Sequence, residues 1–153
     1  RDCQLWPRAG PVMTVLRSGV DLVDVQRLAG LNPAIRERFL RRVYTPRELL
    51  VCQDANAQPS YESLAGRFAA KEAVAKALGV GIGPLAWQEI EILAGPCGEP
   101  LLHLHGAAQA AARQQGLQTW SVSISHTRTQ AVATAVAIGS LAQPEGHEHS
   151  GGQ

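Results

Sequence analysis

The sequence predicts an α+β fold in which a mostly antiparallel sheet packs against one long central helix. Helix-forming patterns gather in the first half of the chain, whereas patterns with the period of two that is typical of strands gather in the second half. One early strand pattern precedes all of the helices. The chain has 153 residues, of which 45% are hydrophobic and 18% are charged, so a single globular domain is expected.

The overall composition excludes several classes of protein. A formal net charge of +1 gives no reason to expect general binding to nucleic acid or to a membrane. No apolar run is long enough to span a bilayer, and no secretory signal peptide is visible. Cys3, Cys52 and Cys97 lie far apart and form no zinc-binding pair, which favours a reduced, cytoplasmic protein.

The two ends of the sequence differ from its middle. Residues 1–12 contain two prolines and no periodicity, so we expect a disordered extension there. Residues 141–153 are polar and rich in glycine, and we expect them to form a disordered tail. The folded domain is therefore predicted over residues 13–140.

Short helices follow the first strand, which is expected at residues 14–22. Asn32 followed by proline predicts the start of a helix that runs to about residue 43. Thr45-Pro46-Arg47-Glu48 has the pattern of a capping box and opens a helix to about residue 54. The longest helix is expected to begin after Ser60 and to end at Gly79. The remaining elements are predicted as strands at 88–93 and 100–104, a helix at 106–115, and a hairpin of strands at 118–126 and 130–138.

The longest helix has two chemically different sides. Alanines recur on one arc, at positions 69, 73 and 77, so this side can lie close to a sheet. The opposite side carries three cations and one carboxylate: Arg67, Lys71, Glu72 and Lys76. This polar side is either a solvated surface with a Glu72–Lys76 ion pair or a site where cations bind phosphates and the carboxylate holds a metal. Three glycines follow in a flexible loop, Gly79, Gly81 and Gly83.

Acidic and histidine side chains lie near the ends of two predicted strands. Asp21 is near the end of the first strand, where either it or Asp24 caps the next helix, or Asp21 joins one Glu as a magnesium ligand. His126 ends a late strand and is either structural or a contact to phosphate or a nucleotide. A pair of histidines at 103 and 105 could chelate zinc, but no third ligand is near them in the sequence.

A basic segment lies in the predicted helix that starts at Asn32. Its arginines are Arg36, Arg38, Arg41 and Arg42, against the single Glu37. Such a segment is either a solvated surface or, given the near-neutral whole chain, a docking surface for an acidic protein.

Three segments, read in order, resemble one known family. They are Gly19-Val20-Asp21-Leu22-Val23-Asp24, the helix from Arg67 to Gly79, and Val122-Ser123-Ile124-Ser125-His126-Thr127. Together they are similar to the holo-acyl-carrier-protein synthases, and the resemblance covers residues 14–138. Tyr44 departs mildly, because the family often has phenylalanine there.

The resemblance implies the 4'-phosphopantetheinyl transferase fold and a magnesium-dependent reaction. The serine hydroxyl of an acyl-carrier protein would attack the β-phosphorus of coenzyme A and release adenosine 3',5'-bisphosphate. Asp21 and Glu72 are implied as magnesium ligands and catalytic residues, together with Lys76 as a phosphate contact. Residues implied to bind coenzyme A, or to orient the site, are Arg67, Lys71, Lys76, Gly79, Gly81, Gly83, His126 and Thr127.

The resemblance also implies partners. Arg27, and Arg38 or Arg41, would contact an acidic carrier protein, and the chain would form a homotrimer. The general base could be a metal-bound water, Glu72 or a lysine of lowered pKa. Fatty-acid, polyketide and other carriers are all compatible with the sequence. Two alternatives to a transferase are a noncatalytic module that binds coenzyme A or a nucleotide, and an interaction protein that uses only its basic surface.

Overall fold

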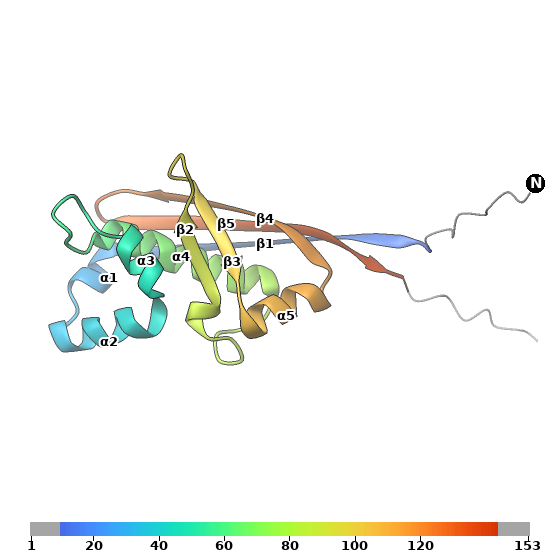
Figure 1. Cartoon of the computed structure of the whole chain (residues 1–153), viewed down its shortest axis with the longest axis horizontal. Coiled ribbons are helices and arrows are strands. Elements are labelled where there is room, and N and C mark those ends of the chain that lie inside the picture. The colour runs from blue at the N-terminus through green and yellow to red at the C-terminus, as the bar shows by residue number, and fades with distance from the viewer. Residues whose placement is uncertain (1–9, 144–153) are drawn as a thin grey trace, which may run out of the picture.

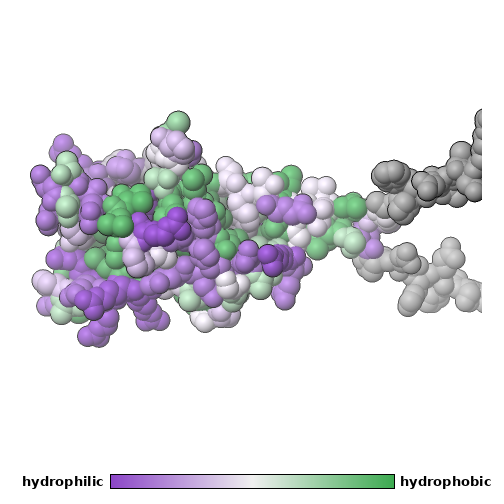
Figure 2. Space-filling view, in the orientation of Figure 1, coloured by the Kyte–Doolittle hydropathy of each residue, from purple (hydrophilic) through white to green (hydrophobic). Residues whose placement is uncertain are grey.

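The fold is organised around its longest helix, as the sequence predicts. The computed structural model describes residues 10–143. The elements are β1 (Val12–Asp24), α1 (Val25–Ala29), α2 (Pro33–Val43), α3 (Pro46–Val51), α4 (Tyr61–Leu78), the 3-10 turn η1 (Trp87–Glu89), β2 (Ile90–Ala94), β3 (Pro100–Leu104), α5 (Gly106–Gln114), β4 (Leu117–His126) and β5 (Gln130–Ala142). Helix α4 runs along one face of the sheet formed by β1, β4 and β5. The β2–β3 hairpin crosses the helix on the side that faces away from this sheet (Figure 1). Hydrophilic side chains gather over α2, at the lower left of Figure 2.

All the strand pairs within the described ladders are antiparallel. The main sheet has the order β1-β5-β4, so the first strand of the chain pairs with the last one. The second sheet is the β2–β3 hairpin. The predicted α+β class with a mostly antiparallel sheet and a long central helix is confirmed.

Side-chain caps set the helix starts that the sequence predicts. The side chains of Asn32, Thr45 and Ser60 each accept a backbone N–H at the start of α2, α3 and α4. Helix α3 ends at Val51, earlier than predicted, because the Asp54 carboxylate accepts the backbone N–H of residues 56 and 58 and turns the chain. The local capping signals therefore locate helix starts better than helix ends.

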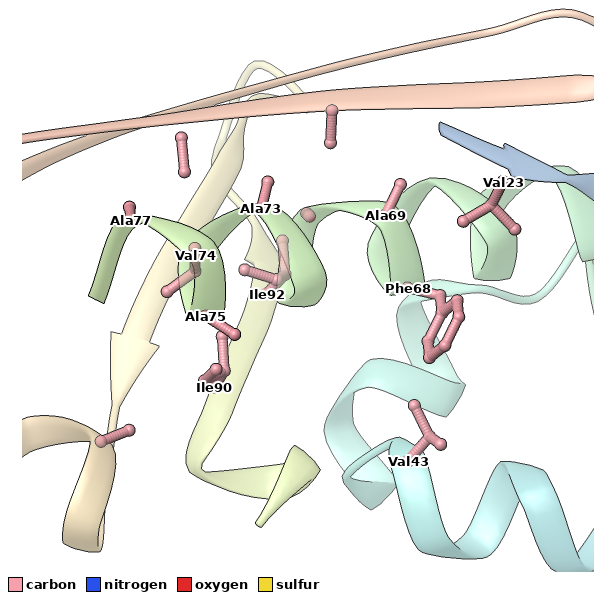
Figure 3. Packing of buried hydrophobic residues seen from close by; sticks show 14 of the residues in the cluster. Val23, Val43, Phe68, Ala69, Ala73, Val74, Ala75, Ala77, Ile90 and Ile92 are labelled. Atoms are coloured by element: carbon pink, nitrogen blue, oxygen red, sulfur yellow. The ribbon is translucent and has the colours of Figure 1, made fainter. Parts of the chain in front are cut away.

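The alanine side of α4 brings the helix close to the main sheet. Ala69, Ala73 and Ala77 are buried and point from α4 towards the strands (Figure 3). β1 comes nearest at Gly19, where an added Cβ would lie 1.9 Å from the carbonyl oxygen of Ala73. Only glycine fits at this crossing, and the close approach puts Asp21, two residues further along β1, next to the polar side of α4.

The other face of the main sheet, which we call the outer face, exposes apolar side chains. Strand alternation puts Leu16, Val20 and Leu22 on the side of β1 opposite Arg17, Gly19 and Asp21. The three apolar side chains are exposed, at 65%, 55% and 61%. The outer face also includes exposed Val136 and Ile138 of β5. No described residue covers this apolar surface.

The folded part extends beyond the predicted boundaries. β1 and β5 pair from Val12 with Ala142, and the Gln143 N–H donates to the carbonyl of Pro11 at 3.0 Å. Residues 141 and 142 thus belong to a strand and not to the predicted tail. The other parts of the predicted extension and tail, 1–9 and 144–153, lie outside the described residues. Over residues 10–143, no helix has the length and apolar character needed to cross a membrane.

Candidate active site

Asp21 and Lys76 meet where β1 crosses the end of α4. Lys76 Nζ lies 2.9 Å from Asp21 Oδ1 and donates a second hydrogen bond, also 2.9 Å, to the carbonyl of Val20. The Asp21 side chain is only 13% exposed, whereas Lys76 is 56% exposed. No ion pair between Glu72 and Lys76 is formed among the described residues, because Lys76 pairs with Asp21 instead. The Asp24 side chain caps α1 through the N–H of Gln26, which leaves Asp21 free for another role.

The carboxyl groups of Asp21 and Glu72 lie close together, and Lys76 forms an ion pair with only one of them. Among residues 10–143, buried Asp21 Oδ2 has no hydrogen-bond partner. Burial and the neighbouring Asp21 carboxylate raise the pKa of Glu72 to about 7, against the opposing charges of Lys76 and Arg27. A hard divalent cation such as Mg²⁺ prefers carboxylate oxygens and retains positions for water and phosphate. The two carboxyls therefore fit the predicted Mg²⁺.

A zinc site finds no support in residues 10–143. No group of three or more His, Cys, Asp or Glu side chains there is arranged to hold a metal. His105 instead contacts Glu91, with 3.2 Å between Nε2 and Oε1. A structural zinc site needs four protein ligands, whereas Mg²⁺ is commonly held by one or two carboxylates plus substrate phosphates.

A hollow opens beside Glu72 and Lys76 and continues along the glycine loop. We call it the glycine-lined hollow; its volume is about 370 Å³, and its lining is Glu72, Ala75, Lys76, Gly79, Val80, Gly81, Ile82 and Trp87. Gly79 ends α4 with a φ of 67°, which favours glycine. An added Cβ at Gly81 or Gly83 would meet no atom of the chain within 4 Å. The φ of 158° at Gly83 favours glycine by itself, whereas nothing within the described chain explains Gly81, whose open space suits the close approach of a ligand.

A further hollow shares Lys76 and Gly79 but has a different cation at its wall. Its volume is about 680 Å³, and Arg17 and Gln115 lie on its border. Arg17 was not among the predicted site residues, although strand alternation puts it on the same face of β1 as Asp21.

Arg67 and His126 form a second cluster, away from the first. They share a hollow of about 330 Å³ with Glu62, whose carboxylate lies 3.4 Å from His126 Nδ1. Arg67 donates to the carbonyl of Ile92 at 3.1 Å and to a serine hydroxyl at 2.9 Å. Glu62 and Glu72 are ten residues apart in α4, which is about 15 Å along the axis. A single chain thus does not bring Arg67 and His126 to the Asp21–Glu72 pair.

Two of the residues predicted to bind coenzyme A have other partners. Lys71 was expected to face phosphates or to orient the site, but its side chain is 0% exposed and its ammonium contacts Glu48. The phosphate-binding prediction is wrong for Lys71, because β2 and α3 cover that part of α4. The Thr127 hydroxyl accepts the N–H groups of Thr129 and Gln130 in the turn between β4 and β5.

The arginines of α2 divide into structural and exposed ones. Arg36 donates to the carbonyl of Ala29 at 2.9 Å and lies over the ring of Tyr61, so it fixes the helix in place. Arg41 pairs with Glu37 on the surface. Arg38 and Arg42 are exposed. We call Arg38, Arg41 and Arg42 the basic surface of α2.

Comparisons with known proteins identify the family of the chain. The family model of the 4'-phosphopantetheinyl transferase superfamily matches residues 17–136. A holo-[acyl-carrier-protein] synthase of Herpetosiphon aurantiacus is 46% identical over 132 residues, which cover 82% of this chain and 100% of that protein. One from Desulforudis audaxviator is 43% identical and covers 82% of this chain and 94% of its own length.

The similar solved structures are also holo-[acyl-carrier-protein] synthases. The Helicobacter pylori holo-[acyl-carrier-protein] synthase in complex with coenzyme A matches with a TM-score of 0.68 and 35% identity, over 78% of this chain and 98% of that one. The Neisseria meningitidis enzyme matches with a TM-score of 0.69 and 35% identity, over 79% and 96%. The chain therefore belongs to the 4'-phosphopantetheinyl transferase superfamily and, within it, to the holo-[acyl-carrier-protein] synthases.

Proposed function

We propose that this protein transfers 4'-phosphopantetheine from coenzyme A to a serine of an apo acyl-carrier protein, with Mg²⁺, and releases adenosine 3',5'-bisphosphate. The observation that carries the proposal is the buried Asp21 Oδ2 without a described partner, beside Glu72 and Lys76 at the rim of the glycine-lined hollow. Two neighbouring carboxylates, next to a lysine and an open hollow, suit the binding of a magnesium-bound pyrophosphate.

Asp21 and Glu72 would hold the magnesium ion. The bound ion supplies neutralisation of phosphate charge and a fixed orientation of the pyrophosphate. Lys76 holds Asp21 without ligand and, being 56% exposed, can turn towards a phosphate oxygen when the ligand arrives. Its ammonium then offsets the charge that develops on the leaving oxygen.

The structure narrows the choice of general base. Lys71 is excluded, because its ammonium is fully buried and cannot reach a serine hydroxyl on another protein. Glu72 remains, because it lines the glycine-lined hollow beside Lys76. A water beside Glu72 also remains, and we favour it because Glu72 is then free to hold the metal.

The proposed assembly is a homotrimer. The outer face carries five apolar side chains that are at least 42% exposed, which is an unusual surface for an isolated chain. A neighbouring copy packed on this face would bury them. The same assembly could bring Arg67 and His126 of one copy to the Asp21–Glu72 pair of the next, and the nucleotide end of coenzyme A would then lie between copies.

The proposed protein partner is an acidic carrier protein, and the proposed location is the cytoplasm. The basic surface of α2 offers paired and unpaired arginines for docking. Arg27 lies in the last turn of α1, and its positive charge acts on the pKa of Glu72. Arg27 is therefore close enough to the reaction site for its charge to act there.

Intact-mass measurement tests the proposed function. Apo acyl-carrier protein is incubated with this protein, coenzyme A and magnesium, and a parallel sample contains EDTA. We expect a mass gain of one phosphopantetheine that is absent with EDTA. No gain with several carrier proteins, together with measurable coenzyme A binding, would instead identify a noncatalytic coenzyme A-binding module.

A further inference from the structure

A fully buried ion pair lies behind the active-site side of α4. Lys71 Nζ and Glu48 Oε1 are 2.7 Å apart, and both side chains are 0% exposed. The lysine also donates to the carbonyl oxygens of Ile90, at 2.6 Å, and of Trp87, at 3.1 Å. An ammonium group has three N–H donors, so all of them are used.

The carboxylate end of the pair is equally well satisfied. Glu48 Oε1 also accepts the N–H of Thr45, at 3.0 Å, and Oε2 accepts the N–H of Ile92, at 3.0 Å. The two charges therefore join α3 and α4 to the segment that runs from η1 into β2. Every bond that they make beyond the ion pair goes to backbone groups, so the pair fixes the course of the chain.

One of these backbone groups belongs to a wall of the glycine-lined hollow. Trp87 lines the hollow together with Glu72, which directly follows Lys71 in α4. The glycine loop begins at Gly79, whose N–H donates to the carbonyl of Lys76 at 3.0 Å. The loop returns to α4 at Trp87, where Lys71 holds the carbonyl. The same helix thus anchors both ends of the loop.

Stability alone is a poor explanation for this pair. Two charges removed from water lose much solvation free energy, and well-packed apolar side chains at such a position are often as stable or more stable. An apolar residue at position 71 would pack in the core but could not hold two carbonyl oxygens. The feature that only the ammonium provides is the fixed position of Trp87 and Ile90 relative to α4.

We propose that Glu48 and Lys71 are positioning residues that hold the Trp87 wall of the hollow in place for coenzyme A. This inference rests on the proposed function, because it takes coenzyme A as the ligand of the hollow. Lys71 acts through Trp87 and the glycine loop, and it does not touch the ligand.

The test compares coenzyme A binding with stability in a variant that removes both charges. Glu48→Gln/Lys71→Met keeps an amide oxygen for the Ile92 N–H and leaves no buried charge unpaired. We expect its Tm to stay within a few degrees of wild type. Its Kd for coenzyme A, measured by calorimetry with magnesium and without carrier protein, should rise about tenfold. Hydrogen exchange should quicken over residues 79–90 and at Thr45, whose N–H loses its acceptor, and not elsewhere in the described chain.

Tyr44→Phe is the matched control. It removes a buried hydrogen bond of 2.7 Å from the Tyr44 hydroxyl to the carbonyl of Leu64, on the same side of α4, without contact to Trp87. This variant should lose stability but bind coenzyme A like the wild type. Coenzyme A binding that is unchanged in Glu48→Gln/Lys71→Met would overturn the proposal. Wild-type protein that binds coenzyme A but transfers nothing would overturn only the proposed transferase activity.

Discussion

Lys76 pairs with Asp21, across the crossing of α4 and β1, and not with Glu72 one turn earlier on its own helix. The distance from Nζ to Oδ1 is 2.9 Å, and a second bond reaches the carbonyl of Val20. Lys76 therefore joins α4 to two consecutive residues of β1, Val20 and Asp21. It also shows that the Asp21 carboxylate already has a cationic partner, Lys76, whose place a metal ion could take.

Loss of the Lys76 charge is expected to slow the reaction. Lys76→Met should lower kcat about a hundredfold, which is the usual effect of removing one donor to developing charge. Lys76→Arg keeps the charge and should retain more activity. Stability should change little, because the ion pair with Asp21 is more than half exposed on the lysine side. A kcat for Lys76→Met that equals the wild-type value would remove Lys76 from the reaction.

Substitution of either carboxylate should abolish turnover while the protein stays folded. Asp21→Ala and Glu72→Ala each remove one of the two proposed magnesium ligands. The loss of turnover can be measured by the mass assay over a range of magnesium concentrations. Asp24→Ala is the control, three residues away on the same segment. It removes the cap of α1 and should cost about 1 kcal/mol of stability but leave activity intact. A near-normal rate of Asp21→Ala or Glu72→Ala at saturating magnesium would exclude the substituted residue from the metal site.

Charge reversal on α2 should weaken docking of the carrier protein. Arg38→Glu is cleaner than a change at Arg41, because Arg41 already pairs with Glu37. We expect a raised KM for carrier protein and an unchanged KM for coenzyme A, with an effect that shrinks at high salt. Arg113→Glu makes the same charge change at an exposed residue of a different helix, α5. Equal effects of both reversals would indicate general electrostatics and not a docking surface.

A charge on the outer face should separate the proposed trimer. Val136→Asp places a carboxylate on β5 at a position that is 42% exposed in one chain. Analytical ultracentrifugation should then show monomers, and activity should fall if the site needs two copies. Leu101→Asp alters a similarly exposed residue, at 39%, on β3 and should leave the assembly unchanged. A wild-type protein that sediments as a monomer would contradict the trimer.

Acid should remove the stability that Glu91 provides. Burial alone would raise the pKa of Glu91, but hydrogen bonds from Thr45 and His105 outweigh it and hold the pKa below its ordinary value of 4.5. A lowered pKa stabilises the folded state above pH 4.5, and this contribution is lost as the pH falls through the lower, folded-state pKa. The Tm difference between wild type and Glu91→Gln should therefore shrink from pH 6 to pH 3. A difference that is the same at both pH values would contradict the assignment.

The predictions that succeeded from sequence depend on short-range chemistry. Asn32, Ser60 and Gly79 mark helix ends through bonds to their own neighbours, so the sequence contains the whole signal. The alanine side of α4 also follows from periodicity alone. Strand alternation separates the side chains of β1 into two faces. It does not indicate which face is exposed, and in the structure the apolar face is the exposed one.

The prediction that failed depends on distant segments. Lys71 shares the polar side of α4 with Lys76, and helical periodicity treats the two lysines alike. Only the folded chain shows that Glu48 and the Ile90 carbonyl cover one of them while the other reaches Asp21. The separation of Arg67 and His126 from Glu72 has the same origin, because residues on one side of a long helix can serve different hollows.

The close contact between β1 and α4 can be tested only by substitutions that enlarge a side chain. Ala73 and Ala77 are already alanine, so substitutions that shorten side chains cannot probe this close interface. Enlargement is the informative change: Ala73→Val or Gly19→Ala would push the strand away from the helix. Asp21 would move with the strand, and a difference of a single methyl group would separate the two carboxylates. Variation at these positions is thus limited by the space available and not by any chemistry of their own.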